Sequence, residues 1–400
     1  MKSGTDRECA PRVAHIVTSL NQGGAQSMLV KLLSALRERF DMHVVSLTDE
    51  GWYGQDIRRM GMSLHCLGME RGALNPLLFF RLSKVLGEIM PDVVQAWMYH
   101  GNLAASIAAL AGRGSMPVIW NVRHSLYDVR LEKKQTRMVI RAGRVLAFQP
   151  DKIIYNSAVA SSQHEGAGFP QSKSVVIPNG VDMNLFYPSE EMKEKICREI
   201  GMAEDALIVG HVARFHPMKD HAGFFAVASD IALKNDRVFF LLLGSGVSYD
   251  NEEISSLVPG QLRERFHLLG VRQDVHQFMA AMDVFCLSSL WGEAFPNVLL
   301  EAMACGVPCV TTDVGDSAHI VGEFGSIVKL GDYSALRRGI EHWLALSEKG
   351  RKKVGEKARA HVSRHYALQS VAEAYADLYV RCSQVEHSEK RRDNALKILF

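Results

Sequence analysis

Two carboxylates, Glu293 and Glu301, lie on either side of a predicted loop-to-helix junction, a spacing that suggests ligand chemistry. Gly292 permits an unusual backbone in the loop, and Pro296 suits the first helical turn. A glycine and a proline further on mark the helix end. Glu293 therefore lies in the loop and Glu301 on the helix. Alternatively, Glu301 is one acid on a solvated helix face.

The start of this helix predicts an anion site. The backbone N–H groups of Asn297, Val298 and Leu299 open the helix, and the positive end of its dipole lies behind them. A phosphorylated ligand flanked by two hydroxyl-binding carboxylates fits this arrangement. Any strand–helix unit contains such a junction, so a purely structural interpretation stays open.

Arg214 and Lys219 are two cations between a predicted strand and the following helix. Arginine binds phosphate through two parallel hydrogen bonds and lysine acts as a point charge, so the pair can neutralise one diphosphate. The alternative is two solvated surface cations. The chain has neither an Asp-x-Asp triplet nor the His-Glu-x-x-His spacing of a zinc site. We therefore expect metal-independent chemistry.

Gly23 and Gly24 follow the first predicted strand. Without a Cβ atom, their backbone N–H groups can approach a phosphate or a sugar closely. A glycine-rich turn is common in strand–helix units, so plain turn chemistry is the alternative. The spacing is not Gly-x-Gly-x-x-Gly, which argues against a nicotinamide oxidoreductase.

A basic segment lies between Arg123 and Lys152, where eight Lys and Arg face three Asp and Glu with apolar residues interleaved. A basic amphipathic helix of this kind binds anionic lipid or the diphosphate of a lipid-linked acceptor. A solvated helix face is the commoner alternative. The net charge of +2 gives no overall attraction to nucleic acid.

Near-continuous apolar runs predict parallel strands that are covered on both faces. The predicted strands are 13–20, 43–48, 92–97, 117–123 and 152–157 in the first half, and 207–212, 238–244, 266–270, 283–289 and 308–312 in the second. Helical patterns lie between them. This alternation predicts an α/β protein with two doubly wound domains.

The length of 400 residues exceeds what one hydrophobic core usually serves. We place the first domain at 1–185, the second at 186–365, a helix at 366–384 and a mobile charged tail at 385–400. Seven scattered cysteines and no long apolar run favour a cytoplasmic protein with at most peripheral contact at the inner face of the membrane.

Several ordered motifs together resemble those of the family 4 retaining glycosyltransferases with the GT-B fold, of the bacterial glycan-biosynthesis type. They are the Glu-x7-Glu segment, Gly-Val-Pro-Cys-Val after it, Pro-Asn-Gly-Val-Asp at 178–182 and Arg-Phe-His-Pro-x-Lys-Asp-His at 214–221. The resemblance implies two Rossmann-like domains that face a central cleft, with the C-terminal helix crossing back to the first. It also implies sugar transfer from a nucleotide diphosphate sugar, first of all a UDP-sugar, to a glycan or lipid-linked acceptor in surface polysaccharide biosynthesis, without a cofactor.

The resemblance also implies roles for the candidate residues. Glu301 would hold the ribose hydroxyls of the donor, and Glu293 the hydroxyls of the transferred sugar. Arg214, Lys219 and the helix start at 297–299 would stabilise the departing diphosphate.

The remaining implied positions lie on other turns. Gly23 and Gly24 would face the donor phosphates across the cleft. Gly244 and Arg272 would lie near the base and its ribose, chiefly through backbone contacts. His124, at a strand end in the first half, would contact the donor sugar near the reacting centre, although a plain polar loop residue is the alternative.

Two related functions stay open on these residues. A sugar-nucleotide epimerase of the same fold would form an isomer from the donor alone. A catalytically silent sugar-nucleotide-binding subunit would keep the fold, although the intact Arg, Lys and paired Glu set argues against it. His319 stands where relatives often carry Glu, which leaves any acidic role at that position in doubt.

Overall fold

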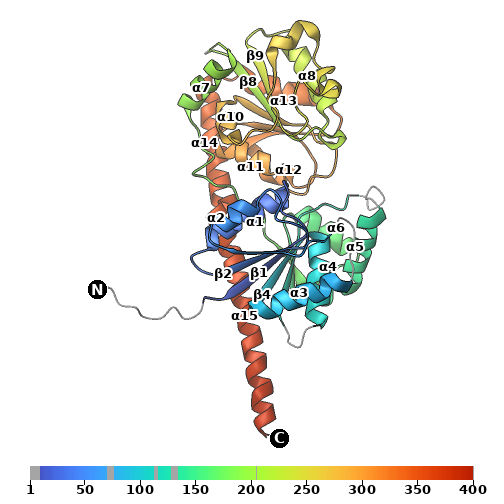
Figure 1. Cartoon of the computed structure of the whole chain (residues 1–400). Coiled ribbons are helices and arrows are strands. Elements are labelled where there is room, and N and C mark those ends of the chain that lie inside the picture. The colour runs from blue at the N-terminus through green and yellow to red at the C-terminus, as the bar shows by residue number, and fades with distance from the viewer. Residues whose placement is uncertain (1–9, 70–75, 112–115, 128–133, 204, 400) are drawn as a thin grey trace, which may run out of the picture. The chain divides into compact units, whose positions relative to one another are not determined.

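The chain folds into two compact α/β units (Figure 1). A computed structural model describes residues 10–69, 76–111, 116–127, 134–203 and 205–399. The chain leaves unit 1 after Gly180, passes through unit 2 from Val181 to Ala367, and returns to unit 1 at Leu368. The first segment of unit 1 therefore ends at Gly180, whereas the sequence analysis placed the end of the first domain at residue 185.

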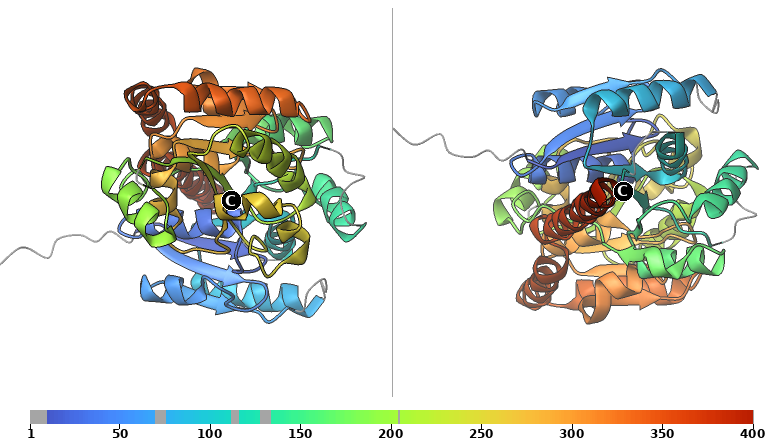
Figure 2. Two further views of the ribbon diagram at one scale, coloured as in Figure 1. Left: turned by 90° about the horizontal axis from the view of Figure 1, so that it is seen from above. Right: turned by 90° about the horizontal axis from the view of Figure 1, so that it is seen from below.

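Unit 1 contains a seven-stranded parallel sheet in the order β3-β2-β1-β4-β5-β6-β7. The strands are β1 (Arg12–Val17), β2 (Asp41–Ser46), β3 (Ser63–Cys66), β4 (Val93–Trp97), β5 (Val118–Val122), β6 (Lys152–Tyr155) and β7 (Ser174–Val176). The helices are α1 (Gly24–Leu36), α2 (Gly54–Arg59), α3 (Pro76–Ile89), α4 (Met98–Ala111), α5 (Lys134–Leu146), α6 (Ala158–Gly166) and α15 (Leu368–Leu399). Figure 2 shows α3 and α15 on opposite faces of this sheet.

Unit 2 contains a six-stranded parallel sheet in the order β10-β9-β8-β11-β12-β13. The strands are β8 (Leu207–Val212), β9 (Val238–Leu243), β10 (Phe266–Leu268), β11 (Val284–Leu287), β12 (Cys309–Thr312) and β13 (Gly325–Val328). The helices are α7 (Glu190–Ile200), α8 (His221–Ala232), α9 (Glu252–Ser255), α10 (Val275–Ala281), α11 (Asn297–Ala304), α12 (Ser317–Val321), α13 (Tyr333–Ala345) and α14 (Glu348–Tyr366).

The unit 2 sheet is buried on both faces, which explains its apolar sequence. Successive side chains of a strand point to opposite faces. In β9, Leu241 and Leu243 belong to one buried apolar cluster, whereas Phe240 and Leu242 belong to another. Each predicted strand is present with its ends shifted by a few residues, and the prediction of two doubly wound α/β domains is confirmed.

The C-terminal helix α15 packs on unit 1 through one buried stripe that includes Val371, Tyr375 and Tyr379. Arg39 also donates to the Glu373 carboxylate at 2.6 Å. Helix α15 continues to Leu399, so the stretch from residue 385 that was predicted as a mobile charged tail is helical. That stretch is rich in Glu, Lys, Arg and Leu, which favour helix, and it extends an existing helix without a new nucleation step.

Each sheet reverses its strand order at one place, between β1 and β4 in unit 1 and between β8 and β11 in unit 2. Ligands of open α/β sheets bind outside the carboxyl ends of the strands at such a reversal. The topology therefore predicts that ligands bind near the loops after these four strands. Within the described ranges, no helix is both long enough and apolar enough to cross a bilayer.

Candidate active site

The loops after β8 and β11 lie side by side and carry three of the predicted site residues of unit 2, Arg214, Lys219 and Glu293. The Leu290 N–H donates to the Met218 carbonyl at 2.9 Å, which joins the two loops through their backbones. The ammonium of Lys219, from the first loop, forms an ion pair with the carboxylate of Glu293, from the second. The structure thus brings together two residues that the sequence analysis placed in separate motifs.

Glu293 is held by two donors that share one carboxylate oxygen. The Ser289 hydroxyl donates to Glu293 Oε1 at 2.7 Å, and Lys219 Nζ donates to the same oxygen. Glu293 is only 8% exposed and Ser289 is fully buried. A hydroxyl that binds a carboxylate inside a protein fixes its rotamer strongly, because the charged hydrogen bond is poorly screened.

Arg214 is exposed at the start of the first loop, and its Nη2 lies 3.5 Å from Met218 Sδ. The Met218 methyl group occupies the space above Gly292, where a Cβ atom would come within 2.4 Å of it. Because Gly292 also has φ of +77°, a side chain there would be both strained and in collision. Glycine at this position therefore relieves the backbone strain of the positive φ, whereas the Met218 methyl group is the flexible end of its side chain and could move aside.

Gly244 follows β9 and packs against the backbone of Ala213 and Arg214. A Cβ atom on Gly244 would lie 2.1 Å from the Ala213 carbonyl oxygen and 2.9 Å from the Arg214 nitrogen. Gly244 has φ of +148°. Its packing against this backbone shows a structural need for glycine that the sequence analysis, which placed it near the donor base, had not identified.

Two buried histidines lie beneath the first loop. His211 on β8 is fully buried, and burial lowers its pKa well below the ordinary value. Burial also lowers the pKa of His221, at the start of α8, to about 4. Both rings are therefore neutral at physiological pH and add no charge to the cationic loop above them.

Helix α11 begins at Asn297, as predicted, but the third of the backbone N–H groups that were expected to bind an anion is already used within the protein. Asn297 and Val298 are partly exposed at the helix start, and Pro296 provides no side-chain cap. The Leu299 N–H donates to the Pro296 carbonyl at 3.2 Å, so this group contributes less to an anion site than expected. Glu301 lies one turn beyond Asn297 on the same helix face.

Arg272 makes protein contacts through Nε and Nη2 of its guanidinium. Its guanidinium donates to Asp274 at 2.9 Å through two nitrogens and to Glu199 at 3.1 Å. It also lies over the Phe278 ring. A donor near this turn would accordingly meet backbone rather than the Arg272 charge. His319 lies exposed on α12, and nothing in the structure assigns it a role.

In unit 1, the turn after β1 presents exposed backbone at Gly23 and Gly24. Gln26 Nε2 donates to the Ser19 carbonyl at 3.1 Å, which ties the start of α1 to the strand end. A Cβ atom on Gly23 would lie 2.5 Å from Gln26 Oε1, whereas one on Gly24 would meet nothing. The Gln26 amide is the flexible end of its side chain, so this contact alone does not require glycine at position 23.

His124 lies after β5 and packs edge-on against the Tyr99 ring, with ring centroids 6.0 Å apart. Tyr99 in turn hydrogen-bonds to the buried His164, at 2.8 Å from its hydroxyl to Nε2. The loop beyond His124 is also fixed, because Ser125 Oγ and the Leu126 N–H bind one Gln163 oxygen at 2.7 and 2.8 Å. Helix α6 therefore orients this loop through two side chains that the sequence analysis missed.

The basic segment of unit 1 is narrower than predicted. The Arg123 guanidinium donates to Asn179 and to the Tyr375 hydroxyl and lies over the Trp97 ring, so it belongs to the interior. Part of the segment, residues 128–133, lies outside the described residues. The described basic surface consists of the four cations of α5: Lys134, Arg137, Arg141 and Arg144.

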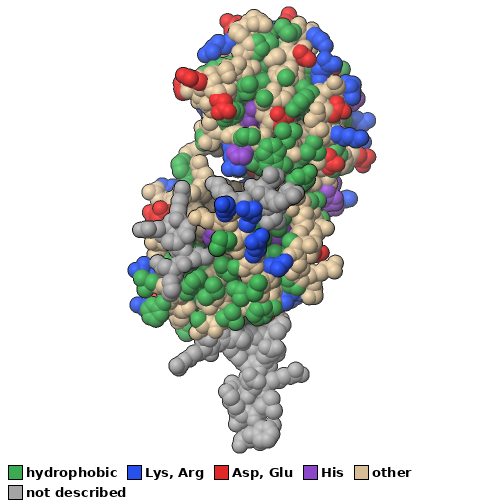
Figure 3. All heavy atoms as spheres, turned by 90° about the vertical axis from the view of Figure 1, so that its right-hand side faces the viewer, with side chains coloured by type: hydrophobic (Ala, Val, Ile, Leu, Met, Phe, Trp, Pro, Cys, Tyr) green, Lys and Arg blue, Asp and Glu red, His purple; other side chains and the backbone are tan. Residues whose placement is uncertain are grey.

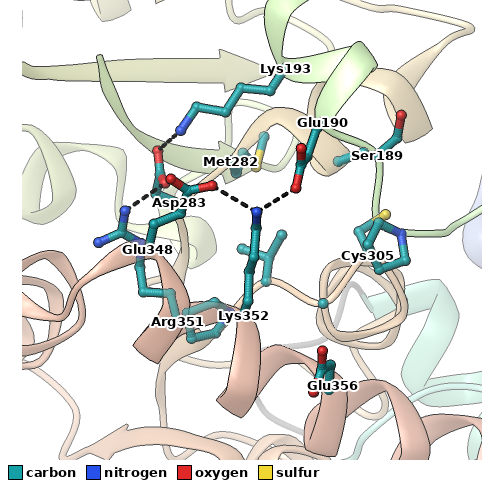
Figure 4. A pocket seen from close by; sticks show the side chains of 15 residues that line it. Ser189, Glu190, Lys193, Met282, Asp283, Cys305, Glu348, Arg351, Lys352 and Glu356 are labelled. Atoms are coloured by element: carbon teal, nitrogen blue, oxygen red, sulfur yellow. Dashed lines mark hydrogen bonds and ion pairs between the residues drawn. The ribbon is translucent and has the colours of Figure 1, made fainter. Parts of the chain in front are cut away.

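A cavity of about 320 Å³ lies at the opposite end of the unit 2 sheet (Figure 4). Asp283, just before β11, accepts from Lys193 at 2.7 Å, from Arg351 at 3.0 Å and from the Ile208 N–H at 2.9 Å. Lys352 pairs with two glutamates at the rim. Since these three cations are all matched by carboxylates, the network stabilises the unit and leaves none of the three cations unpaired. Among the residues described, no group of three His, Cys, Asp or Glu is arranged to hold a metal ion.

Comparison with known proteins defines the family. The model described as Glycosyltransferase Family 4 matches residues 22–185, and the one described as Glycosyl transferases group 1 matches residues 206–345. The chain therefore belongs to the family 4 glycosyltransferases. EpsF of Bacillus subtilis (strain 168) is 29% identical over 317 residues, 76% of this chain and 79% of that protein.

A second relative has a more specific name. The UDP-Gal:alpha-D-GlcNAc-diphosphoundecaprenol alpha-1,3-galactosyltransferase of Escherichia coli is 28% identical over 80% of this chain and 84% of its own length. Among solved structures, Anabaena HepE in complex with UDP-glucose matches with a TM-score of 0.79 and 22% identity over 92% of this chain and 99% of that one. The predicted GT-B fold is confirmed by this likeness.

Proposed function

We propose that this chain is a retaining, metal-independent glycosyltransferase that moves a sugar from a UDP-sugar to a lipid-linked glycan acceptor in surface polysaccharide biosynthesis. The observation that supports this proposal most is the Lys219–Glu293 pair beside Arg214 at the β8/β11 reversal. Arg214 and Lys219 supply two cations for a diphosphate, and Glu293 beside them supplies a carboxylate for sugar hydroxyls. The E. coli relative, named for a UDP-galactose donor and a diphosphoundecaprenol acceptor, supports the choice of substrates.

The proposed roles follow from the chemistry of each group. Arg214 and Lys219 neutralise the departing diphosphate, and the start of α11 adds backbone N–H groups. Glu293 accepts hydrogen bonds from the transferred sugar, and Glu301, one turn into α11, accepts them from the ribose. His124 in unit 1 contacts the sugar near its reacting carbon.

The reaction that we propose is a same-face substitution. The bond from the anomeric carbon to the diphosphate oxygen breaks, and the acceptor hydroxyl oxygen bonds to that carbon from the same side. The hydroxyl proton passes to an oxygen of the leaving diphosphate, so atoms and charge balance. Positive charge at the diphosphate lowers the barrier because negative charge develops there in the transition state.

A panel of nucleotide sugars tests the donor. UDP-, GDP- and ADP-sugars are screened by thermal shift, since a ligand that binds only the folded state raises the melting temperature. We expect UDP and at least one UDP-sugar to stabilise the protein, and Lys219→Ala or Glu301→Ala to abolish the shift. Stabilisation by no nucleotide, or unchanged shifts in both variants, would remove the proposal.

Turnover assays test the chemistry. With a lipid-linked or synthetic diphosphate acceptor, transfer should continue in EDTA, because side-chain cations carry the leaving group. Formation of a sugar-nucleotide isomer without acceptor would instead indicate an epimerase. Activity that depends on added divalent cation would contradict the metal-independent mechanism.

The acceptor is proposed to be held at a membrane that α5 contacts, at its cytoplasmic face. The residues Lys134, Met138, Arg141, Val145 and Phe148 recur at spacings of three and four and form one exposed stripe. Met138 and Val145 are 68% exposed and Phe148 65%. Figure 3 shows basic side chains gathered beside apolar ones on the face of unit 1 that carries α5. Exposed apolar and basic side chains on one helix suit an anionic lipid surface.

A further inference from the structure

Two consecutive serines, Ser288 and Ser289, follow β11 at the centre of the proposed donor site. Both are buried, at 1% and 0% exposure. Because successive side chains of an extended segment point to opposite sides, the two hydroxyls reach different elements. Neither serine carries a role in the proposed reaction, and a buried hydroxyl needs a partner to offset its desolvation.

Ser289 holds the carboxylate of Glu293, which is proposed to bind the sugar. Its hydroxyl donates to Glu293 Oε1 at 2.7 Å, and its own carbonyl accepts from Thr312 Oγ1 at 2.5 Å. The serine is therefore fixed by β12 while it fixes Glu293. Lys219 reaches the same Oε1. With both protein donors on Oε1, a sugar hydroxyl is expected at Oε2.

Ser288 holds the loop after β8, which is proposed to bind the diphosphate. Its hydroxyl lies 2.9 Å from the Lys219 carbonyl and 3.2 Å from the Asp220 carbonyl, and donates to this pair. His211 Nε2 lies 3.3 Å from the same hydroxyl. Since the single hydroxyl proton is directed to the carbonyls, the neutral His211 must carry its proton on Nε2 and donate to Ser288.

We propose that Ser288 and Ser289 are positioning residues for two different parts of the donor. Ser288 positions the cationic loop that binds the diphosphate, and Ser289 positions Glu293, which binds the sugar. This inference rests on the proposed function. It predicts that affinity for UDP alone and the additional affinity for the sugar can be lost separately by changes at adjacent residues.

Calorimetry on the full chain tests the division. The probes are UDP and whichever of UDP-glucose, UDP-galactose, UDP-N-acetylglucosamine and UDP-N-acetylgalactosamine binds the wild type most tightly. In Ser289→Ala, we expect the UDP dissociation constant to stay within about twofold and the preference for the sugar nucleotide to fall about tenfold, the effect of one lost hydrogen bond to a charged group. In Ser288→Ala, UDP binding should weaken about fivefold with the preference retained.

Controls separate positioning from folding. Ser106→Ala removes a buried hydroxyl that Trp120 Nε1 contacts at 2.9 Å in unit 1, and both affinities should stay unchanged. Ser289→Cys keeps the side-chain size with a weak donor and should lie between wild type and Ser289→Ala. In a Glu293→Gln background, Ser289→Ala should reduce the sugar preference no further, because both changes act through one carboxylate.

The outcomes are distinguishable. A wild type that binds neither UDP nor any of the four sugar nucleotides sinks the proposed function, and this inference with it. A wild type that binds them while Ser289→Ala keeps its full sugar preference sinks only the assignment of Ser289. Equal loss of both affinities in both variants would show general disruption of the loops and would overturn the division.

Discussion

Lys219 and Glu293 lie 74 residues apart in the sequence and form an ion pair at the carboxyl edge of the unit 2 sheet. Both side chains are largely shielded from water, at 15% and 10% exposure. If the Lys219 ammonium binds the donor diphosphate, it must either keep its ion pair with Glu293 at the same time or break that ion pair. The two halves of the proposed donor site are therefore coupled before any ligand arrives.

Glu293→Gln should separate nucleotide binding from catalysis. The change removes the negative charge beside Lys219, so we expect UDP to bind as tightly as in the wild type or up to about fivefold tighter. Sugar transfer should fall about a hundredfold, because the sugar loses a charged hydrogen-bond acceptor. Calorimetry with UDP and initial transfer rates measure the two effects. A UDP affinity weakened more than about fivefold would contradict the coupling.

Asp283→Ala should destabilise unit 2 without affecting the donor. The change leaves Lys193 and Arg351 without their shared carboxylate, and breaking a buried pair in this way costs about 3 kcal/mol of unfolding free energy. Urea denaturation measures the loss. Asp205→Ala, which removes an exposed pair with Arg237, is the matched control and should cost less than about 1 kcal/mol. A weaker UDP affinity of folded Asp283→Ala would contradict the placement of this network away from the donor.

The exposed stripe of α5 should determine vesicle binding. Replacing Met138 and Val145 by serine, or Arg141 and Arg144 by glutamate, should each lower sedimentation with phosphatidylglycerol vesicles at least about fivefold, since either the apolar or the cationic contribution is lost. High salt should weaken only the cationic contribution. Arg338→Glu combined with Arg364→Glu changes two exposed arginines of unit 2 and is the control for total charge. Equal binding of all variants would remove the membrane proposal.

Acid should destabilise unit 1 through its buried histidines. Burial lowers the pKa of His15 to about 3 and that of His164 to about 4, both from 6.5. Below pH 6.5 the unfolded chain takes up protons that the folded unit refuses, so stability is complete above this pH and falls as the pH drops toward 4. The loss is about 1.4 kcal/mol per pH unit for each histidine.

Urea titrations between pH 7.5 and 4.5 measure this loss by tryptophan fluorescence. His15 Nδ1 accepts from Trp97 Nε1 at 3.2 Å, so protonation at Nδ1 would break that bond. His15→Phe lacks the titrating group, and its stability should depend less steeply on pH than that of the wild type by about one proton. An unchanged slope would show that His15 does not contribute.

The central strands could be predicted because each is buried on both faces and reads as an apolar run. Three edge strands, β3, β7 and β13, were missed for the converse reason, and β7 has no fully buried residue. β3 alternates exposed and buried residues, and β13 begins with Gly325 and Ser326 and is only partly buried. Edge strands carry fewer apolar residues because one side meets solvent, so their sequence signal is weaker.

The site was predictable as motifs and not as contacts. Arg214, Lys219, Glu293 and the start of α11 stand out by charge, spacing and helix signals. The pairing of Lys219 with Glu293 depends on β8 and β11 being neighbours, a topological fact that residue types do not encode. Ser289 gave no signal in the sequence beyond its place at a strand end. The role of a buried serine becomes visible only when the structure shows the group to which its hydroxyl donates.

The path of the chain makes unit 2 an insertion within unit 1. Gly180 and Leu368 lie so close that a Cβ atom on the glycine would come within 2.8 Å of the Leu368 Cα. A direct or one-glycine fusion of these positions should yield a free-standing N-terminal module closed by its own C-terminal helix. Exchanging unit 2 between relatives accordingly needs two splice points, and cleavage at either crossing alone would leave unit 2 covalently joined to the part of unit 1 beyond the other crossing.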